Sequence, residues 1–290
     1  MQAQMMETLD ACPVCGGKRT DCEAAELQLW RCADCGVFFN NPRPTKTFIE
    51  KNYNEGDHYA RFAPDEKWNR FWARRMDRVL KHKPRGPILD ISAGIGTAVK
   101  QLRDRGLVCN GSEISKEAIA RARELYGLEL MEGYPEELAL GRGSLGCLMM
   151  WHVFEHLPFP GRALVHLADK IASGGLLVIA VPNSSFARLA KHRKLWFAPR
   201  RAKLEALIGK IDYNIKFQEI HLIHFTPASL RRIVEAAGFT VLEHGVDNVL
   251  SKWRDAKLPL RNLAARLGFN DAPAMVLIAR KTGPPAALRA

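Results

Sequence analysis

From residue 88 onward, short apolar runs alternate with segments in which apolar residues recur every three or four positions. Runs of four to seven apolar residues have the length of buried strands, and the periodic segments are typical of amphipathic helices. The pattern predicts strands at residues 88–91, 107–111, 129–131, 147–151, 176–181, 241–246 and 275–279. Helices are expected between most of these strands. This alternation predicts an α/β fold with a Rossmann-like, doubly wound, mostly parallel seven-stranded sheet.

The first 86 residues follow a different pattern. Residues 1–45 are rich in turn formers and cysteines and end in the sequence Asn-Asn-Pro-Arg-Pro, which predicts a boundary. Apolar residues at helical spacing over 67–80 predict an amphipathic helix. We therefore expect a small module at 1–45, a helical linker or cap at 46–86, and a main domain at 87–290. An additional segment, 184–218, is inserted in the main domain after the fifth strand.

Composition excludes several classes of protein. Hydrophobic residues make up 47% of the 290 residues and charged residues 26%, which is ordinary for a folded chain and unlike disordered or collagen-like sequences. No apolar run approaches the roughly 18–20 residues of a membrane span. The first ten residues lack the basic and apolar pattern of a signal peptide. We expect a cytoplasmic protein.

The formal net charge of +12 is concentrated in two stretches, residues 61–86 and 186–210. Concentrated positive charge favours an anionic partner, which includes a phosphate-bearing substrate, nucleic acid or a membrane surface. The alternative is two solvated helix faces. The insert 184–218 is interpreted as a basic lid over an anionic acceptor, with an RNA contact or a peripheral membrane helix as rival interpretations. Its aromatic, basic and helix-periodic residues are Trp196, Phe197, Arg200, Arg201, Leu204, Leu207, Ile208 and Ile211.

Four of the seven cysteines form two Cys-x-x-Cys pairs separated by sixteen residues. Each pair places two thiolates on one tight turn, and two such turns complete the tetrahedral sulfur shell that suits zinc. A redox dithiol and chance spacing are the alternatives. Because all four positions would be cysteine, a metal there would have a structural role. The predicted ligands are Cys12, Cys15, Cys32 and Cys35.

Candidate ligand-binding residues follow the first two predicted strands. Asp90 lies at the end of the first strand, and residues 92–97 form a turn with Gly94 and Gly96 that leads into a helix. Glycines let a backbone approach a ligand closely, and amides at a helix N-terminus can receive its polar atoms. Glu113 follows the second strand, where a carboxylate can accept hydrogen bonds from ribose hydroxyls.

The segment 88–97 resembles motif I of class I S-adenosylmethionine-dependent methyltransferases. Residues 151–157, 174–183 and 221–239 resemble later parts of the same family. The whole chain is similar to a subgroup in which a cysteine-rich zinc ribbon precedes the methyltransferase domain, and to ubiquinone-biosynthesis O-methyltransferases. Ser92 departs from the motif, since it replaces the first glycine. The resemblance implies the following cofactor-binding residues: Gly94 and Gly96 at the methionine part, Glu113 at the ribose, Met150 or Trp151 at the adenine, and Asp90 and Ser92 beside them.

Methyl transfer to a hydroxyl requires alignment of the acceptor and removal of its proton, and histidine suits the second task near neutral pH. His221, His152 and His156 are the candidate bases, in that order, and His224 lies near them. In ubiquinone-type relatives, positions such as 152, 155 and 156 bind Mg²⁺. Because His152 replaces a carboxylate here, we do not expect Mg²⁺.

The resulting hypothesis is a methyltransferase that uses S-adenosylmethionine to modify a small or lipid-linked anionic acceptor, at oxygen. An RNA methyltransferase and a non-catalytic zinc-ribbon binding protein are the alternatives. A nicotinamide-dependent dehydrogenase is disfavoured because the full Gly-x-Gly-x-x-Gly pattern is absent. The sequence does not specify the acceptor or the oligomeric state.

Overall fold

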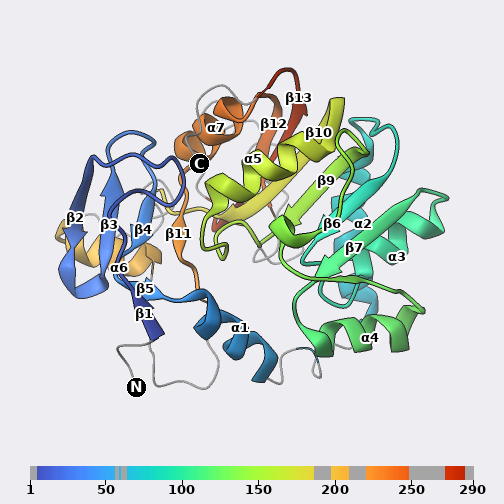
Figure 1. Cartoon of the computed structure of the whole chain (residues 1–290), viewed down its shortest axis with the longest axis horizontal. Coiled ribbons are helices and arrows are strands. Elements are labelled where there is room, and N and C mark those ends of the chain that lie inside the picture. Colours follow the sequence, from blue (N-terminus) through green and yellow to red (C-terminus); the bar gives the residue numbers. More distant parts are fainter. Residues whose placement is uncertain are drawn as a thin grey trace.

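A seven-stranded sheet forms the centre of the molecule in the computed structural model (Figure 1). The structure describes residues 5–55, 59, 64–185, 197–208, 220–247 and 272–284. The strand order is β12-β13-β10-β9-β6-β7-β8. Neighbouring strands from β10 to β8 are parallel, and β13 is antiparallel to both β10 and β12. The expectation of a mostly parallel, Rossmann-like sheet is confirmed.

The seven strands lie close to the segments predicted from sequence. The second strand begins two residues later than expected and continues to Glu113, and the fifth begins directly after a helix. Their bounds are β6 Ile88–Ile91, β7 Cys109–Glu113, β8 Met131–Glu132, β9 Leu145–Trp151, β10 Ile171–Pro182, β12 Phe239–Val246 and β13 Ala274–Lys281.

Helices cover both faces of this sheet. Helices α2 (Glu66–Leu80), α3 (Thr97–Asp104) and α4 (Lys116–Tyr126) contribute to one apolar cluster, whereas α5 (Pro160–Lys170) and α7 (Pro227–Ala236) contribute to another. Along β9, side chains alternate between the two clusters: Met150 belongs to the α5 and α7 side, and Trp151 to the α2 and α3 side. This alternation decides which helices each candidate cofactor residue faces.

Side-chain caps explain where several of these helices begin. The Asp65 carboxylate accepts from the Trp68 amide, and the Ser115 hydroxyl accepts from the Ala118 amide. Thr226 forms a reciprocal capping box with Ser229, and Pro227 occupies the first turn of the same helix. No helix among the described residues is long and apolar enough to span a bilayer.

The N-terminal module forms its own small sheet beside the main domain (Figure 1). Strands β2 (Thr20–Ala24), β3 (Leu29–Cys32) and β4 (Phe38–Asn40) are extended by β11 (Ile223–His224), which comes from the main domain. Two further short strands, β1 (Met6–Glu7) and β5 (Arg43–Pro44), pair with each other. The two parts therefore share a sheet as well as an apolar cluster.

Arg43, in the segment predicted as a boundary, is fully buried. Its guanidinium pairs with Glu7 and with the carbonyl of Pro158, and it stacks on the ring of Phe159. A short helix, α1 (Lys46–Glu55), follows. Through Arg43, the module therefore contacts the loop that follows β9 directly.

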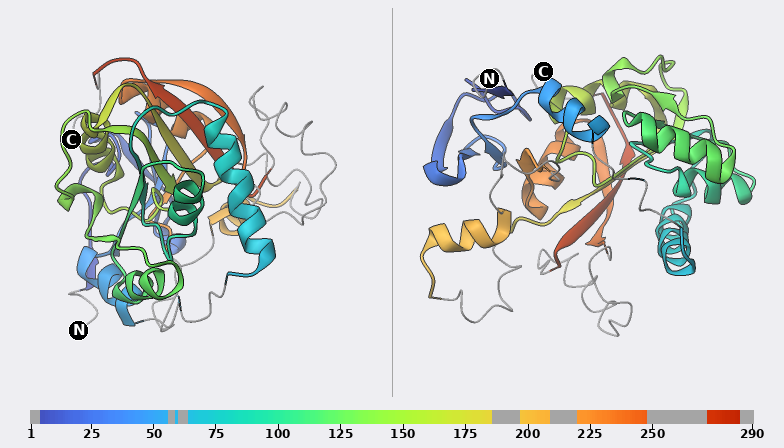
Figure 2. Two further views of the ribbon diagram at one scale, coloured as in Figure 1. Left: turned by 90° about the vertical axis from the view of Figure 1, so that its right-hand side faces the viewer. Right: turned by 90° about the horizontal axis from the view of Figure 1, so that it is seen from below.

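Helix α6 (Arg200–Ile208) is the described part of the predicted insert, and it runs along the small sheet (Figure 2). Leu204 packs in an apolar cluster with residues of the module, including Leu27 and Phe38. Arg200 and Arg201 form ion pairs with Glu23 and Glu26 of that module. Trp196 and Ile211 of the predicted lid lie outside the described residues.

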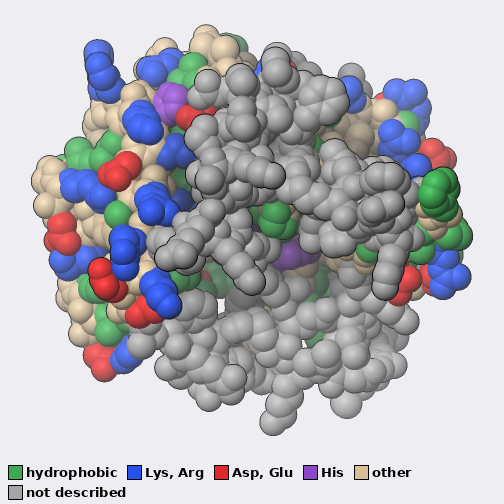
Figure 3. All heavy atoms as spheres, turned by 180° about the vertical axis from the view of Figure 1, so that it is seen from behind, with side chains coloured by type: hydrophobic (Ala, Val, Ile, Leu, Met, Phe, Trp, Pro, Cys, Tyr) green, Lys and Arg blue, Asp and Glu red, His purple; other side chains and the backbone are tan. Residues whose placement is uncertain are grey.

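Part of the other basic stretch is also paired. Arg75 and Arg78 form ion pairs with Asp247 and Glu243, at and near the end of β12. From behind, Lys and Arg side chains intermingle with Asp and Glu at the end of the molecule that carries α3 and α4 (Figure 3). In the described part of both stretches, much of the positive charge is therefore balanced by carboxylates of the same chain.

Candidate active site

The turn between β6 and α3 lies beside the end of β7. Glu113 is buried, and its carboxylate accepts hydrogen bonds from the amides of Gly94, Ile114 and Ser115 at 2.8–3.0 Å. Burial raises the pKa of Glu113, while these three amides oppose that rise. The carboxylate therefore fixes the glycine turn against the second strand and retains acceptor capacity for a ligand.

Three residues of this turn, Ser92, Gly94 and Gly96, have left-handed backbone conformations. Ser92 has φ +52°, so the serine that replaces the motif's first glycine adopts a conformation that favours glycine. At Gly96, with φ +78°, an added Cβ would lie 2.7 Å from the side chain of Leu128. Glycine at this position therefore suits both the positive φ and the close approach of Leu128. A Cβ at Gly94 would contact the ring of Tyr59, which lies over the turn.

Asp90 is the second buried carboxylate at this edge. It is 1% exposed, and neither carboxylate oxygen has a hydrogen-bond partner among the described residues. Burial raises the pKa of Asp90 to about 8, with Arg75 opposing and Glu113 reinforcing the rise. The hydroxyl of Ser112 on the neighbouring strand is likewise buried and unpartnered within the described chain. Such orphaned groups fit a ligand that brings a cation and hydrogen-bond donors.

An aromatic wall formed by α2 adjoins the end of β9. The rings of Trp72 and Trp151 meet edge to face at 5.9 Å, and the Arg75 guanidinium lies within 4.7 Å of both. Trp151 is 7% exposed, whereas Met150 is fully buried on the opposite face of the sheet. Because the two side chains face opposite sides, they cannot cover the same face of a ligand.

A buried chain of charged groups continues from this wall. Arg75 pairs with Asp247, and Asp247 contacts Nε2 of His152 at 2.8 Å. Burial lowers the pKa of His152, but Asp247 and Glu155 raise it to a net value of about 9. The Arg75 guanidinium and His152 hold the pKa of Asp247 well below its usual range despite burial. His152 is therefore an imidazolium at neutral pH and cannot accept a proton there.

His156 and His221 lie together, with ring centroids 4.9 Å apart. Glu155 lies beside them, and the ligand atoms of these three residues are all within 4.8 Å of one another. The Nδ1 atom of His156 is 2.7 Å from the Ile220 carbonyl, so Nδ1 carries a proton and donates it to that carbonyl. The structure thus brings two of the three predicted histidines together and places the third, His152, against Asp247.

His224 has a structural position. It is 4% exposed, its Nε2 atom donates to the Asn40 side-chain oxygen at 2.9 Å, and burial lowers its pKa to about 3. Magnesium bound by residues 152, 155 and 156 does not fit the geometry, because His152 already faces Asp247 and Glu155 with its two nitrogens. Two imidazoles in three positions also suit Mg²⁺ poorly, since Mg²⁺ prefers oxygen ligands.

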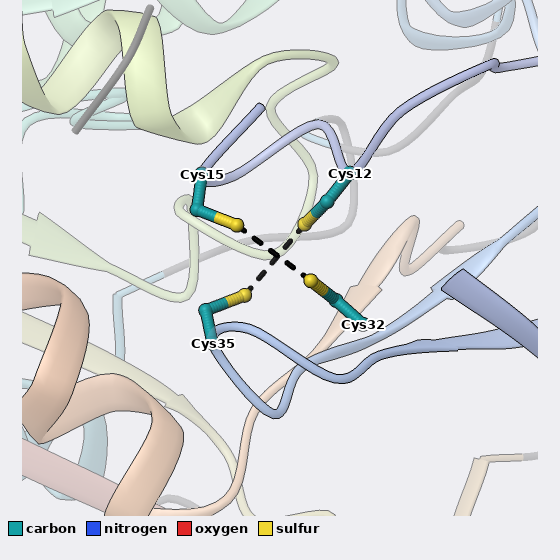
Figure 4. Close-up of side chains that lie close together, drawn as sticks. All are labelled: Cys12, Cys15, Cys32 and Cys35. Carbon is teal, nitrogen blue, oxygen red and sulfur yellow. Dashed lines mark hydrogen bonds between the residues drawn. The ribbon is translucent and has the colours of Figure 1, made fainter. Parts of the chain in front are cut away.

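The four predicted zinc ligands converge on one point (Figure 4). The sulfur atoms of Cys12 and Cys35 are 3.6 Å apart, as are those of Cys15 and Cys32. A tetrahedral zinc–thiolate site with Zn–S bonds of about 2.3 Å requires sulfur separations of about 3.8 Å. Gly16 and Gly36, after the second cysteine of each pair, have positive φ values of 70° and 79°. The cluster therefore fits a structural zinc ion.

A model of the methyltransferase-domain family matches residues 59–244. The chain belongs to this family. The matched region contains Asp90, the glycine turn and Glu113, and it begins at Tyr59, the residue that lies over Gly94. Together with the fold, the match makes this chain an S-adenosylmethionine-dependent methyltransferase of the class I type.

Solved structures of methyltransferases share the fold at low identity. Magnesium protoporphyrin IX methyltransferase from Synechocystis, solved with bound S-adenosylhomocysteine, is 14% identical with a TM-score of 0.53 and covers 82% of this chain and 100% of its own. A Thermotoga maritima methyltransferase, described as a possible histamine N-methyltransferase, is 20% identical with a TM-score of 0.50, covering 75% and 94%. The Pyrococcus horikoshii protein PH0226 is 14% identical with a TM-score of 0.53, covering 78% and 99%. No curated protein matches the sequence.

Sequence reasoning missed several residues of this site. Asp247 and Arg75 are 172 positions apart, and only the return of β12 to the sheet edge brings them together. Asn40, from the ribbon, gave no indication of its contact with His224. Glu155 was noted only beside the magnesium positions, although its full burial next to two histidines makes it central to the geometry.

Proposed function

We propose that this methyltransferase modifies a hydroxyl group of a small or lipid-linked anionic acceptor. The observation that carries the proposal is that the candidate residues gather at the carboxyl-terminal end of the sheet. The unpartnered Asp90 carboxylate and the Glu113-bound turn lie at the carboxyl ends of β6 and β7, and His156 follows the carboxyl end of β9 with His221 packed against it. In parallel α/β sheets, ligands bind at the carboxyl ends of the strands.

Bound S-adenosylmethionine would supply a methyl group already activated on a sulfonium. In the proposal, Asp90 binds its ammonium group and Glu113 accepts from its ribose hydroxyls. Gly94 and Ser92 shape the turn beneath Tyr59, and Trp151 is the adenine-side candidate because its buried indole N–H lacks a partner within the described chain. Met150 is fully buried on the opposite face of the sheet, where it packs in the core.

On the acceptor side, we assign the proton-accepting role to His221. His152 is held as an imidazolium by Asp247, so it stabilises negative charge on an anionic acceptor instead of removing a proton. His156 uses Nδ1 to bind the Ile220 carbonyl, which orients its ring beside His221. The segment that carries His221 is held by the Leu222 and Ile223 amides, which donate to the Glu155 carbonyl.

The four-cysteine cluster is proposed to bind structural zinc. A module of about 45 residues has a small core, so metal binding would supply much of its folding free energy. All four ligands come from cysteine, which leaves no open position for catalysis.

The experiment that tests the acceptor class uses methyl-labelled S-adenosylmethionine, the purified protein and an extract of its own cells. Products are separated into RNA, protein, lipid and small-molecule fractions. Label in the lipid or small-molecule fraction, lost in His221→Asn, supports the proposal. Label in RNA overturns it in favour of an RNA methyltransferase. Absence of label together with absence of S-adenosylhomocysteine binding favours the non-catalytic binding protein.

A further inference from the structure

Glu155 is an unusual group for a protein interior. Its side chain is 1% exposed, and neither carboxylate oxygen has a hydrogen-bond partner among the described residues. The nearest imidazole nitrogens are Nδ1 of His152 at 3.5 Å and Nε2 of His156 at 3.9 Å, both too long for a well-formed hydrogen bond. The His152 imidazolium offsets part of the cost of burying this carboxylate, and a bound cation would offset more of it.

The backbone around Glu155 holds two histidines in place. The Ile220 carbonyl accepts from Nδ1 of His156, which leaves Nε2 on the side of Glu155, 3.9 Å from its carboxylate. A metal-binding histidine is commonly oriented in this way by a carbonyl on its other ring nitrogen. His221 is fixed from the next residue, because the Leu222 amide donates to the Glu155 carbonyl at 2.9 Å.

The spacing of the three ligand atoms suits a metal ion. They lie within 4.8 Å of one another. Bonds of about 2.0–2.2 Å to nitrogen and oxygen place neighbouring ligands about 3–3.5 Å apart, so side-chain shifts that bring the ligand atoms closer by up to about 1.5 Å would close the site. Two imidazole nitrogens and one carboxylate oxygen favour borderline divalent ions such as Zn²⁺, Fe²⁺ or Co²⁺ over Mg²⁺ or Ca²⁺.

We propose that Glu155, His156 and His221 form a second metal site, distinct from the four-cysteine cluster, which binds a borderline divalent transition-metal ion. The site differs from the magnesium arrangement at positions 152, 155 and 156, because it excludes His152 and recruits His221 from the segment before β11. Three protein ligands leave at least one coordination position for an oxygen atom.

The role of this ion adds to the proposed function and rests on it. The binding of the ion to these three residues does not depend on that function. A divalent ion lowers the pKa of a hydroxyl that it binds. With the ion bound, His221 would serve as a ligand, and the acceptor hydroxyl, acidified by the ion, would lose its proton to water. The role of His221 as the proton acceptor would then apply to the metal-free protein.

Cobalt titration of the metal-free full-length protein tests the proposal without any activity assay. Co²⁺ bound to four thiolates gives intense sulfur-to-metal charge-transfer absorption, whereas Co²⁺ bound to nitrogen and oxygen gives only weak visible bands. We expect two equivalents of Co²⁺ per chain, and excess Mg²⁺ should not displace either. Glu155→Gln and His221→Asn should each remove the equivalent that lacks charge-transfer absorption, and Cys12→Ser should perturb the other.

His166→Gln, a half-buried histidine of α5 outside the cluster, is the matched control and should retain both equivalents. Saturation of the wild-type protein at one equivalent, with a purely thiolate spectrum, would overturn the proposal whether or not the variants fold. Retention of the second equivalent in both triad variants would overturn it as well. S-adenosylhomocysteine binding, measured on the same preparation, separates this failure from failure of the proposed function.

Discussion

Asp90 and Glu113 show how two buried carboxylates at one sheet edge acquire different roles. Glu113 accepts from three backbone amides, so it organises the turn even before a ligand arrives. Asp90 has no such partner among the described residues, and its pKa is raised to about 8 by burial. The energetic cost of burying Asp90 is therefore met only by protonation or by a cationic ligand.

The raised pKa of Asp90 predicts a pH dependence for S-adenosylhomocysteine affinity. Because ionised Asp90 would pair with the ligand's ammonium group, binding below pH 8 requires loss of a proton from Asp90. Affinity should rise with pH toward about 8, by up to about tenfold per pH unit. Above that pH the affinity should level off, because Asp90 is then already ionised. Calorimetry from pH 6 to 9 measures the rise and the plateau.

Asp90→Asn is the control for this dependence. It should bind more weakly, and its affinity should no longer rise between pH 6 and 8. The unliganded protein should behave in the opposite sense, since a carboxyl with a raised folded pKa adds stability at low pH and loses that contribution as pH rises through about 8. An acid limb of unchanged slope in Asp90→Asn would contradict the assignment of Asp90.

At the scale of elements, the N-terminal module, here called the ribbon, contacts the methyltransferase domain at the turn between its first two cysteines. Val14 lies between the first two cysteines, and its carbonyl packs against Gly161 in the first turn of α5. A Cβ at Gly161 would lie 1.8 Å from the Val14 carbonyl oxygen. Glycine at this helix position therefore allows two backbones to approach closely.

Gly161→Ala should destabilise the protein even though alanine is the better helix former by about 1 kcal/mol. The clash involves backbone atoms, which cannot rotate away, so the ribbon must shift from α5. We expect a lower melting temperature in thermal unfolding followed by circular dichroism. Gly141→Ala, where the nearest atom to an added Cβ is 3.6 Å away, should leave the melting temperature nearly unchanged. Equal melting temperatures for both variants would show that the Val14 carbonyl moves away from position 161 without loss of stability.

The pairing of β4 with β11 links the ribbon to the segment that carries His221. The backbone amide of Asn40 donates to the Leu222 carbonyl, and the side-chain oxygen of Asn40 accepts from His224. The Leu222 amide in turn donates to the Glu155 carbonyl. Removal of the ribbon metal should therefore loosen residues 220–224 while leaving the cofactor turn ordered.

Hydrogen exchange measures this coupling. In Cys12→Ser, amides of residues 222–224 should exchange at least about tenfold faster, whereas those of β6 should be little affected, because the two lie in different cooperative units. Cys22→Ser, an exposed cysteine outside the cluster, should match the wild type. Unchanged protection of residues 222–224 in Cys12→Ser would mean that this segment is held by the main domain alone.

For the whole molecule, local patterns predicted the strands and the order of the motifs well. Runs of apolar residues and capping residues act over a few positions, so β6, β9 and the start of α4 were visible in the sequence. The contacts that define the acceptor side are not local: Asp247 reaches His152 across 95 positions, and β11 joins the ribbon sheet from 184 positions beyond Asn40. No spacing rule carries such information.

The concentrated positive charge was the sequence feature that predicted the least about the folded molecule. The excess of lysine and arginine suggested open anion-binding surfaces, yet Arg200, Arg201 and Arg75 are paired with carboxylates of the same chain. Net charge depends on composition alone, whereas the availability of a cation depends on which acids the fold places beside it. The convergence of the four cysteines was predictable for the opposite reason, because their spacing is local within each pair.

The most direct test of the account is calorimetric titration of the wild-type protein and two matched variants with S-adenosylhomocysteine. Glu113→Ala removes the proposed ribose acceptor, and Glu132→Ala removes the exposed glutamate in register with it on β8. The account predicts that the wild type binds and that Glu132→Ala binds with the same affinity. Glu113→Ala should bind at least about tenfold more weakly, because hydrogen bonds to a charged acceptor contribute about 1.5–3 kcal/mol each. A wild-type protein that does not bind, or a folded Glu113→Ala variant with unchanged affinity, would contradict it.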